Sequence, residues 1–515
     1  MAAICLVAFF FDLNKMTPNK EQFKSLAAQA NVIPVYSQVL ADMETPVSVF
    51  SKLESRFDDC FMLESAENVD NWGRYSFLGC NPKAVFTLND KHSVLKFADG
   101  REIKSTSTEG LDQIAPLRQY LASRKPARMP ELPSFVGGAV GYFGYECVNM
   151  FERLPEPKGP RTWDDARFAL YDDVIIFDNL RHTAKIAACV HIDEYENLDE
   201  AYAAGERRVA NLTALFRAER PERKVQPCQI DLKSNMTSQE FCAMVEKARQ
   251  YIIEGEAIQI VPSQKFSTDA KIDAIAAYRA LRLINPSPYM FFIKGAGRYL
   301  VGSSPETLIR FKDGTARVRP IAGTRRCGKD LTEDMKLADE LLSNEKERAE
   351  HLMLVDLGRN DLSRFCKTST VMVREFMKIE RYSHVMHLVS DIGGIVREGI
   401  DAFDALKAAF PAGTLSGAPK IRAMEIINEL EPERRGPYGG ATGYIDYSGN
   451  MDLAITIRTL QIAGGKTSVQ AGAGIVYDSV PAFEYEETRM KSRAVAKAIE
   501  AAQNLEDADV GGLVR

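Results

Sequence analysis

The chain has 515 residues, which is more than one compact core normally holds. Hydrophobic residues make up 45% of it and charged residues 26%, as in an ordinary soluble globular protein. The net charge is −6 and there is no basic block, which argues against a nucleic-acid partner. The nine cysteines are scattered and form no C-x-x-C pair, which favours free thiols in the cytoplasm over a disulfide framework.

The N-terminus begins with an apolar run from Ile4 to Phe11. This run is too short to span a bilayer, and it lacks the basic region and cleavage site of a signal peptide. No other segment is apolar enough to cross a membrane, so we expect no membrane association. We interpret residues 1–15 as an extension or a mis-assigned start, and residues 503–515 as a disordered tail.

The region 32–217 is predicted to be rich in short strands separated by polar turns. Within it, the glycine-dense segment Phe135–Glu146 lacks the residue order of a phosphate-binding loop, so we interpret it as tightly packed strand. Helices are expected at 21–30, 47–56, 111–123 and 199–217. Strands are expected at 32–39, 60–65, 74–79, 85–88, 94–97, 102–104, 168–178 and 183–192.

Residues 218–236 are polar and read as a connection to a second region, 237–502. That region opens with Thr237 and Glu240, the spacing of a helix capping box. Pro320–Arg326 is expected to be turn-rich. Helices are expected at 237–255, 273–284, from 344, at 403–409, at 419–430 and from 481. Strands are expected at 257–261, 263–266, 289–293, 298–301, 371–376, 438–445, 453–459 and 467–471. Because strands and helices do not alternate regularly, an α+β fold with antiparallel sheets is favoured.

Two pairs of glutamates stand out in the second region. Glu347 and Glu350 are three residues apart on a predicted helix, so their carboxylates share one face. Glu484 and Glu487 repeat the spacing, with Lys491 four residues further on. Each pair alone is typical of a solvated acidic face. Two pairs near glycine-rich turns suggest instead a hard cation such as Mg²⁺.

Six motifs together resemble the chorismate-utilising enzymes, and most closely their anthranilate synthase component I branch. They are PIAGTRR, ERAEHLMLVDLGRNDL, YSHVMHLVS, GTLSGAPKIRAMEIINELE, DLAITIRT and QAGAGIVYDSVPAFEYEE. The resemblance covers roughly residues 32–501. It implies two large antiparallel β-sheets in a sandwich with helices outside, an active site in residues 237–502, and a regulatory site in residues 32–217.

The resemblance also implies roles for individual residues. Glu350 and Glu487 would bind Mg²⁺ directly, and Glu347 and Glu484 would hold its water ligands. His387 would be a general base or acid, whereas His384 is interpreted as structural. The positions expected to bind or border chorismate are Gly323, Thr324, Thr414, Tyr438, Arg458, Gly472, Ala473 and Gly474.

Two positions distinguish the branches of the family. Aminodeoxychorismate synthases carry a nucleophilic lysine where this chain has Ala322, and isochorismate synthases carry a basic lysine where it has Gln259. Neither residue here can attack the ring or deprotonate water, so we expect ammonia as the nucleophile. Ammonia would add at C2 as the C4 hydroxyl leaves, and proton loss from C2 would then expel pyruvate to give anthranilate.

The ammonia source is absent from the chain, which contains no G-x-C-x-G nucleophile elbow. A separate glutamine amidotransferase subunit is therefore implied, in a heterotetramer with two copies of each component. Two alternatives stay open at this point. One is an aminodeoxychorismate synthase with an unusual alanine, and the other is a catalytically silent subunit that senses tryptophan.

A feedback site for L-tryptophan is expected from two further motifs. Leu63-Glu64-Ser65 and Asn285–Met290 resemble the two halves of the family's tryptophan site. Glu64 would pair with the ligand's ammonium group and Ser65 would hydrogen-bond to it. Pro288, Tyr289 and Met290 would pack on the indole. The alternative is a plain core strand followed by a proline-rich turn.

Overall fold

The computed structural model describes residues 15–65, 72–105, 110–223, 230–382 and 385–503. Most of the expected N-terminal extension, nearly all of the expected tail and His384 therefore lie outside the described residues. Four short 3₁₀ turns occur at Trp72–Arg74, Gly110–Ile114, Tyr145–Met150 and Ile192–Glu194.

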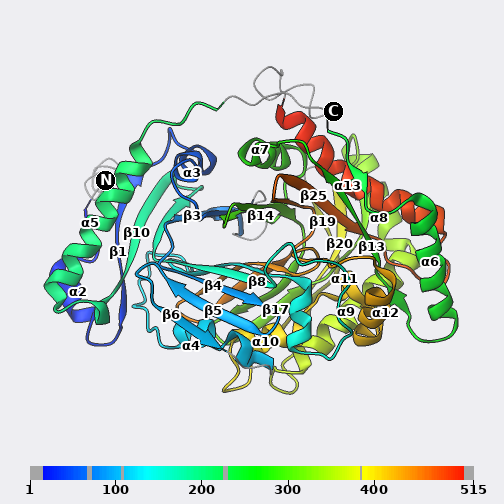
Figure 1. The fold of residues 1–515 in the computed structure, drawn as a ribbon, viewed down its shortest axis with the longest axis horizontal. Coiled ribbons are helices and arrows are strands. Elements are labelled where there is room, and N and C mark those ends of the chain that lie inside the picture. Colours follow the sequence, from blue (N-terminus) through cyan, green and yellow to red (C-terminus); the bar gives the residue numbers. More distant parts are fainter. Residues whose placement is uncertain (1–14, 66–71, 106–109, 224–229, 383–384, 504–515) are drawn as a thin grey trace.

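Two large β-sheets form the frame of the molecule, and every strand pair in them is antiparallel (Figure 1). This confirms the predicted fold class. The 11-stranded sheet runs in the spatial order β1 (Val32–Leu40), β10 (Thr183–His191), β9 (Asp173–Asp178), β3 (Tyr75–Cys80), β2 (Cys60–Glu64), β14 (Tyr289–Gly295), β15 (Arg298–Ser304), β24 (Thr459–Ala463), β25 (Lys466–Gly472), β13 (Ser263–Thr268) and β11 (Lys233–Ser234).

The 12-stranded sheet lies against the first. Its order is β18 (Ile321–Arg326), β20 (Val385–Ile395), β17 (Thr315–Arg319), β16 (Thr307–Lys312), β23 (Met451–Ile455), β22 (Ala441–Asp446), β7 (Gly138–Phe143), β8 (Ala166–Tyr171), β4 (Ala84–Asn89), β5 (His92–Phe97) and β6 (Glu102–Ser105), with β19 (Met372–Arg381) also paired to β20. A two-stranded ladder joins β12 (Gln259–Ile260) to β21 (Gly417–Ala418).

Both sheets draw strands from both sequence regions. In the 11-stranded sheet, β2 of the first region pairs with β14 of the second, and Glu64 stands opposite Met290. In the other sheet, β7 pairs with β22. Because backbone ladders join the two regions inside each sheet, a change in one region can alter the position of strands in the other.

Helices cover the outer faces of the sandwich (Figure 1). The 11-stranded sheet is covered by α3 (Pro46–Glu54), α5 (Leu198–Arg217), α7 (Ala274–Ile284) and α13 (Pro481–Gln503). The 12-stranded sheet is covered by α4 (Ala115–Ala122), α8 (Leu331–Ser343), α9 (Glu345–Ser363) and α10 (Ala402–Ala409). The remaining helices are α2 (Lys20–Leu26), α6 (Ser238–Ile253), α11 (Gly413–Ser416) and α12 (Lys420–Leu430).

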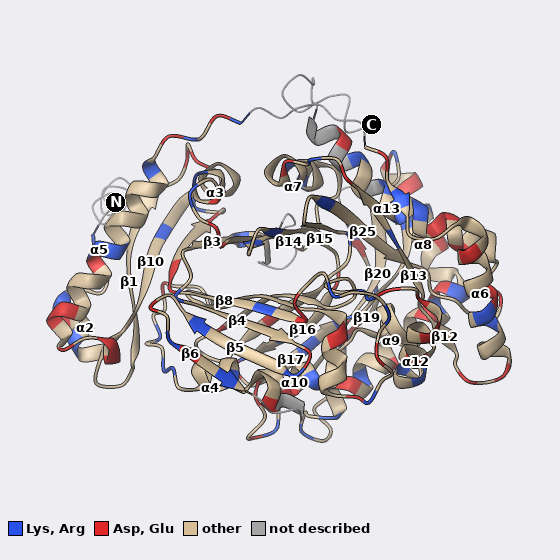
Figure 2. Ribbon diagram, viewed as in Figure 1, with Lys and Arg blue, Asp and Glu red and all other residues tan. Residues whose placement is uncertain are grey.

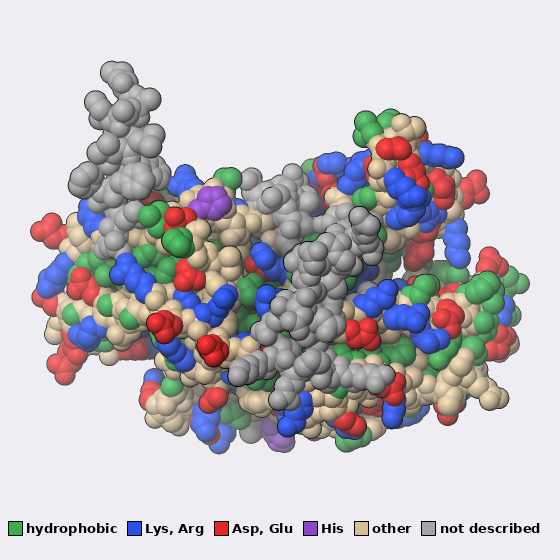
Figure 3. All heavy atoms as spheres, turned by 90° about the horizontal axis from the view of Figure 1, so that it is seen from above, with side chains coloured by type: hydrophobic (Ala, Val, Ile, Leu, Met, Phe, Trp, Pro, Cys, Tyr) green, Lys and Arg blue, Asp and Glu red, His purple; other side chains and the backbone are tan. Residues whose placement is uncertain are grey.

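Alternation of side chains along the strands builds the core on both sides of each sheet. Phe61 of β2 packs against Phe135 between the sheets, whereas its neighbour Met62 packs into the cluster beneath α3 and α7. Charged residues are concentrated on the helices and loops in Figure 2, and Figure 3 shows both signs interspersed on one face. Within the described ranges, no helix is both long and apolar enough to span a bilayer.

Several local signals read from the sequence are confirmed. Thr237 and Glu240 exchange the two hydrogen bonds of a capping box at the start of α6. The glycine-dense segment is strand β7, where a Cβ at Gly141 would lie 1.9 Å from the carbonyl oxygen of Arg167. That distance is far below contact, so glycine is required for β7 and β8 to approach.

Three expectations about strands are wrong. The expected strand 168–178 is two strands, β8 and β9, which lie in different sheets on either side of Asp172. The expected strand 453–459 likewise divides into β23 and β24, with Arg458 in the connection. Neither crossing contains glycine or proline, so no strong turn signal marks it. The expected turn Pro320–Arg326 is largely strand β18, which carries a bulge at Gly323.

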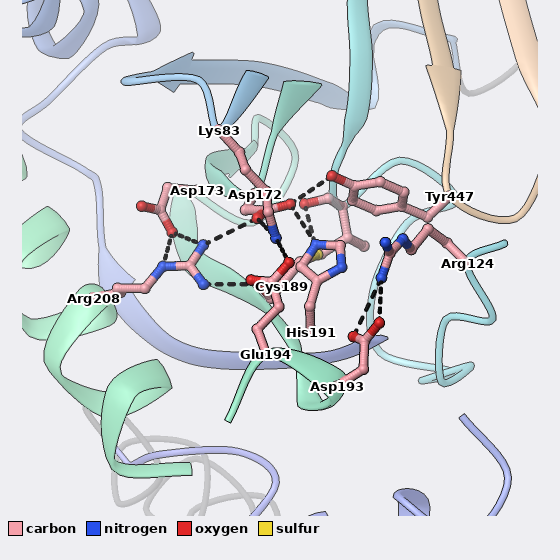
Figure 4. Close-up of polar contacts among 11 residues, drawn as sticks. Lys83, Arg124, Asp172, Asp173, Cys189, His191, Asp193, Glu194, Arg208 and Tyr447 are labelled. Carbon is pink, nitrogen blue, oxygen red and sulfur yellow. Dashed lines mark hydrogen bonds and ion pairs between the residues drawn. The ribbon is translucent and has the colours of Figure 1, made fainter. Parts of the chain in front are cut away.

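The crossing at Asp172 is held by a buried polar cluster (Figure 4). The carboxylate of Asp172 lies 2.9 Å from His191 Nε2 and 3.6 Å from Lys83 Nζ, and it accepts a 2.5 Å hydrogen bond from the hydroxyl of Tyr447. Burial alone would raise the pKa of Asp172, but His191, Lys83 and Arg208 hold it below its ordinary value. This carboxylate therefore stays charged and anchors the point where the chain changes sheets.

Candidate active site

His387 lies opposite Thr324 on paired strands β20 and β18. Its Nδ1 is 2.9 Å from the carbonyl oxygen of Gly323 and 3.0 Å from Thr324 Oγ1. Because a carbonyl oxygen only accepts, Nδ1 carries the proton and Nε2 is the basic nitrogen. Burial lowers the pKa of His387; the Gly323 carbonyl opposes that shift and Arg458 adds to it. The imidazole is therefore neutral near pH 7 and able to accept a proton.

Gly323 brings the strand close to helix α9. Its φ is +64°, in the left-handed region that favours glycine. A Cβ at this position would lie 2.8 Å from Leu341 Cδ1 and 3.0 Å from Glu347 Oε2. The next arginine along the strand, Arg325, pairs with Glu347 at 3.2 Å. The turn of backbone that orients His387 therefore also fixes one of the expected metal-site carboxylates.

The two glutamate pairs face each other from α9 and α13. Burial raises the pKa of Glu350, and the charges of Glu347 and Glu487 raise it further. The pKa of Glu484 is raised by burial and by Glu487, against a hydrogen bond from Ser479. Glu350 therefore interacts electrostatically with Glu347 on its own helix and with Glu487 on α13, and Glu484 interacts with Glu487.

The chemistry of these four side chains suits Mg²⁺, which prefers carboxylate oxygens and water. In the ranges that the structure describes, however, no three His, Cys, Asp or Glu side chains are close enough to hold an ion together. Glu487 pairs with Lys491 at 2.6 Å, and Glu347 with Arg325. The types of donor therefore fit the ion, but the carboxylates would have to leave these ion pairs and move closer together to bind it.

Arg458 lies where the chain crosses from β23 to β24, with φ at +49°. Burial lowers the pKa of its guanidinium, and the nearby carboxyl of Glu306 raises it. Its Nη1 is 3.5 Å from the side-chain oxygen of Asn285. A partly desolvated guanidinium with few protein partners of its own is well suited to a carboxylate ligand.

Glu306 is a further candidate site residue, which the sequence motifs did not indicate. It stands between β15 and β16, is 8% exposed, and accepts from Thr414 Oγ1, which lies 3.2 Å from each carboxylate oxygen. Burial raises the pKa of Glu306 to about 8, despite opposing effects of Thr414 and Arg458. The carboxyl is therefore protonated at neutral pH and can donate a proton. One acidic residue within VGSSPETLI was its weak sequence signal.

Tyr438 and the segment after β25 form another wall of the site. The buried Tyr438 hydroxyl bonds to the backbone of Gly472. Ala473 N donates to the carbonyl oxygen of Pro262 at 3.1 Å. That amide is already used within the protein, so the expectation that it binds chorismate is not met in this arrangement.

Gln259 lies against Gly474, where a Cβ would come within 2.8 Å of the glutamine Nε2. The side chain is 4% exposed, and its Oε1 finds no hydrogen-bond partner among the described residues. An orphaned buried amide oxygen is costly. A small hydrogen-bond donor brought by a ligand would remove that cost.

The expected tryptophan residues lie apart from this set, on β2 and at the start of β14. Glu64 accepts from Tyr278 at 2.7 Å and from Arg282 at 2.8 Å, so its charge is already paired. Ser65 follows it directly, and Pro288 directly precedes β14. Tyr289 bonds to Asp452 between the sheets at 2.9 Å.

Met290 lies on the outer face of the same strand, beneath α7. Successive side chains of a strand point to opposite faces, so Tyr289 and Met290 diverge. The expectation that both side chains pack on one indole is not met in this arrangement. The pairing of Glu64 with Met290 does bring the two sequence halves together.

Comparisons with known proteins agree with one another. Residues 58–497 match the family described as chorismate binding enzyme. The chain is 44% identical to anthranilate synthase component 1 of Acetivibrio thermocellus, over 94% of this chain and 99% of that protein. The corresponding protein of Pseudomonas putida is 45% identical over the same shares.

Among solved structures, anthranilate synthase component I from Streptococcus pneumoniae TIGR4 superposes with a TM-score of 0.73 at 37% identity, covering 83% of this chain and 93% of that one. The motifs, the paired sheets and the sequence relatives all point the same way. The chain therefore belongs to the chorismate binding enzyme family, within its anthranilate synthase component 1 group.

Proposed function

We propose that this chain converts chorismate to anthranilate, with ammonia as the nitrogen donor. The observation that carries the proposal is a complementary pair of groups around Arg458. Glu306 is a buried proton donor and His387 a buried neutral base, and both interact electrostatically with that guanidinium. A proton donor and a proton acceptor flanking a carboxylate-binding cation suit a dianionic substrate that loses a hydroxyl and then a proton.

In the first step, Arg458 holds a substrate carboxylate while Glu306 gives its proton to the C4 hydroxyl. The C4–O bond breaks and the hydroxyl leaves as water, ammonia forms the new C2–N bond as the ring double bonds shift, and the resulting ammonium group gives its extra proton to solvent. The unpaired Oε1 of Gln259 accepts a hydrogen bond from ammonia and orients its lone pair. An amide suits ammonia because ammonia is nucleophilic without deprotonation, whereas water would need a base.

In the second step, His387 Nε2 takes the proton from C2. The electron pair of the broken C–H bond enters the ring, the C3–O bond breaks, and the released enolpyruvate takes a proton from solvent at its methylene carbon to give pyruvate. Aromatisation to anthranilate drives this elimination. Thr324 and the Gly323 carbonyl keep the imidazole in the required tautomer.

Glu350 and Glu487 are the proposed direct ligands of Mg²⁺, with Glu347 and Glu484 acting through water. When bound, the ion would supply positive charge to the ring carboxylate of chorismate. The support for this assignment is the electrostatic repulsion among these carboxylates, which a cation would relieve.

We also propose that ammonia comes from a glutamine amidotransferase subunit, in a heterotetramer of two copies of each component. The relatives are named component 1, which implies a second component. Ala322 lies in β18 directly before Gly323, where an aminodeoxychorismate synthase would place its lysine. L-Tryptophan is the proposed feedback inhibitor. The seven cysteines described by the structure are free thiols, which suits a cytoplasmic location.

Fluorescence detection of anthranilate tests the proposal directly. The purified chain is incubated with chorismate, Mg²⁺ and an ammonium salt, and the product is identified by chromatography. We expect anthranilate and pyruvate in equal amounts. Accumulation of aminodeoxychorismate would identify the other branch of the family, and no turnover at all would favour a silent sensing subunit.

A further inference from the structure

A small cavity adjoins Glu306 and is not used by the mechanism above. Its volume is about 50 Å³. At roughly 10–15 Å³ for each water, it can hold about three or four water molecules. The residues that matter for its chemistry are Glu306, Thr414, Asp361, Gly358 and Ala412.

Asp361 forms the second acidic wall of this cavity. It lies near the end of α9 and is 6% exposed. Its Oδ2 pairs with Lys420 Nζ at 3.0 Å, whereas its Oδ1 has no hydrogen-bond partner among the described residues. A buried carboxylate oxygen without a partner is costly, and a cavity water is the partner available to it.

Lys420 connects Asp361 to solvent. Its Nζ bonds to Asp361 and also to the carbonyl oxygen of Ala409 at 3.3 Å, and its side chain is 10% exposed. Burial raises the pKa of Asp361 and lowers the pKa of Lys420, although each partner opposes the shift of the other. Proton exchange between the two groups is therefore easier than between an ordinary lysine and aspartate.

Glu306 needs such a connection in every turnover. It gives one proton to the departing hydroxyl, which leaves as water, and it must regain one before the next substrate reacts. While substrate or product occupies the site, the side of Glu306 that faces Arg458 is covered. A return path that avoids the substrate would let the acid recover without waiting for product to leave.

We infer that this cavity is the proton inlet of Glu306, and that Asp361 orients its water and passes the proton. The inference rests on the proposed role of Glu306. A cavity water gives one proton to the Glu306 carboxylate and takes one from the carboxyl of Asp361. Asp361 regains its proton from the Lys420 ammonium group, and Lys420 regains one from solvent. Each O–H or N–H bond that breaks is matched by one that forms, and nothing is oxidised or reduced.

Two variants of the full chain test the inlet with ammonium as nitrogen donor. Asp361→Asn keeps the size of the side chain but removes the acid, and Ala412→Val reduces the space for water. Asp356→Asn is the matched control, because Asp356 is an exposed carboxylate on the same helix that pairs with Arg359. Initial rates are measured over a range of chorismate concentrations in H₂O and in D₂O.

We expect Asp361→Asn and Ala412→Val to lower kcat by roughly tenfold or more, an effect that can approach the roughly hundredfold loss typical of groups that transfer protons to the substrate itself. The KM for chorismate should change less than about twofold, and the solvent isotope effect on kcat should increase, because proton return becomes slower than the other steps. Asp356→Asn should behave like the unmodified protein. A fall in kcat with an unchanged isotope effect would indicate structural damage and overturn the inlet.

Glu306→Gln separates failure of the inlet from failure of the proposed function. If that variant still aminates chorismate, Glu306 is not the acid and both ideas fail. If it is inactive while the Asp361 and Ala412 variants keep normal kcat and isotope effects, only the inlet is overturned. If the variants fold poorly, the inlet can be tested by measuring kcat of the unmodified protein in H₂O–D₂O mixtures. A curved dependence of kcat on deuterium fraction supports several protons in transit, and a linear dependence contradicts it.

Discussion

The carboxylate of Glu64 is held by Arg282, whose Nε lies 2.8 Å away. This contact ties the strand that carries the expected tryptophan motif to helix α7. The same helix ends at Asn285, which is 3.5 Å from Arg458. One helix therefore touches both the expected tryptophan motif and Arg458, so a ligand that competes for Glu64 has a physical route to the candidate site.

Tryptophan should inhibit anthranilate formation, and Ser65→Phe should remove inhibition while sparing turnover, because the ring fills the space beside Glu64. Arg282→Gln should change the half-inhibitory concentration by roughly five-fold or more, as expected for a typical coupling energy. Arg279→Gln, an exposed change on the same helix, is the control. Activity of the unmodified protein that ignores millimolar tryptophan would refute the regulatory site.

Removal of the metal should abolish turnover. We expect EDTA to stop anthranilate formation and Mg²⁺ to restore it. Glu350→Gln or Glu487→Gln should each lower kcat by roughly a thousandfold, because an ion that stabilises transition-state charge contributes several kcal/mol. Glu486→Gln is a suitable control, since Glu486 is an exposed neighbour on α13 that pairs with Arg489. Near-normal rates in EDTA would rule out the Mg²⁺ assignment.

The nitrogen source should depend on the second component. Alone, the chain should use ammonium salts and give no anthranilate from glutamine. Addition of the glutamine amidotransferase subunit should make glutamine a donor, and a glutaminase-inactive subunit should not. Turnover with glutamine and no added subunit would contradict the two-component proposal.

The two chemical steps should separate at His387. His387→Ala removes the base that takes the C2 proton, so pyruvate release should fall by roughly a hundredfold or more. Amination should suffer less, and an aminated, non-aromatic intermediate should accumulate and be detected by mass spectrometry. Equal loss of both steps with no intermediate would show that His387 does not act in elimination.

The pH dependence of kcat should follow the protonation of Glu306. Its carboxyl must be protonated to act, and its pKa is about 8, so kcat should fall as pH rises through that value. The concentration of free ammonia must be held constant across the series, because its protonation also changes. Unchanged kcat from pH 7 to 9 would exclude Glu306 as the acid.

The free energy of unfolding should also depend on the protonation of Glu306. A buried carboxyl with a raised pKa binds more protons in the folded than in the unfolded state between the ordinary value and about 8. Stability is therefore lost as pH rises across that window, at ~1.4 kcal/mol per unit at most. The Glu306→Gln variant does not lose stability in this way. The Tm of the variant minus the Tm of the unmodified protein should therefore grow from pH 5 to 8 and then level off.

Much of the local structure could be predicted because its causes are local. Asn344 caps α9 through the amide of Glu347, and Thr237 caps α6 through Glu240. In each cap, the two residues that contact each other are three positions apart in the sequence. The spacing of Glu347 and Glu350, repeated at Glu484 and Glu487, placed each pair on one helical face before any tertiary contact was known.

By itself, the sequence determined the family, the antiparallel α+β class and the capping box of α6. Only the tertiary structure decided which strands belong to which sheet, since the crossings at Asp172 and Arg458 contain neither glycine nor proline. It also decided the chemistry of Glu306 and Asp361. Both carboxyl groups are buried by segments that lie far away in the chain, and this burial sets their protonation and their hydrogen bonding. Burial of that kind cannot be predicted from a local sequence pattern.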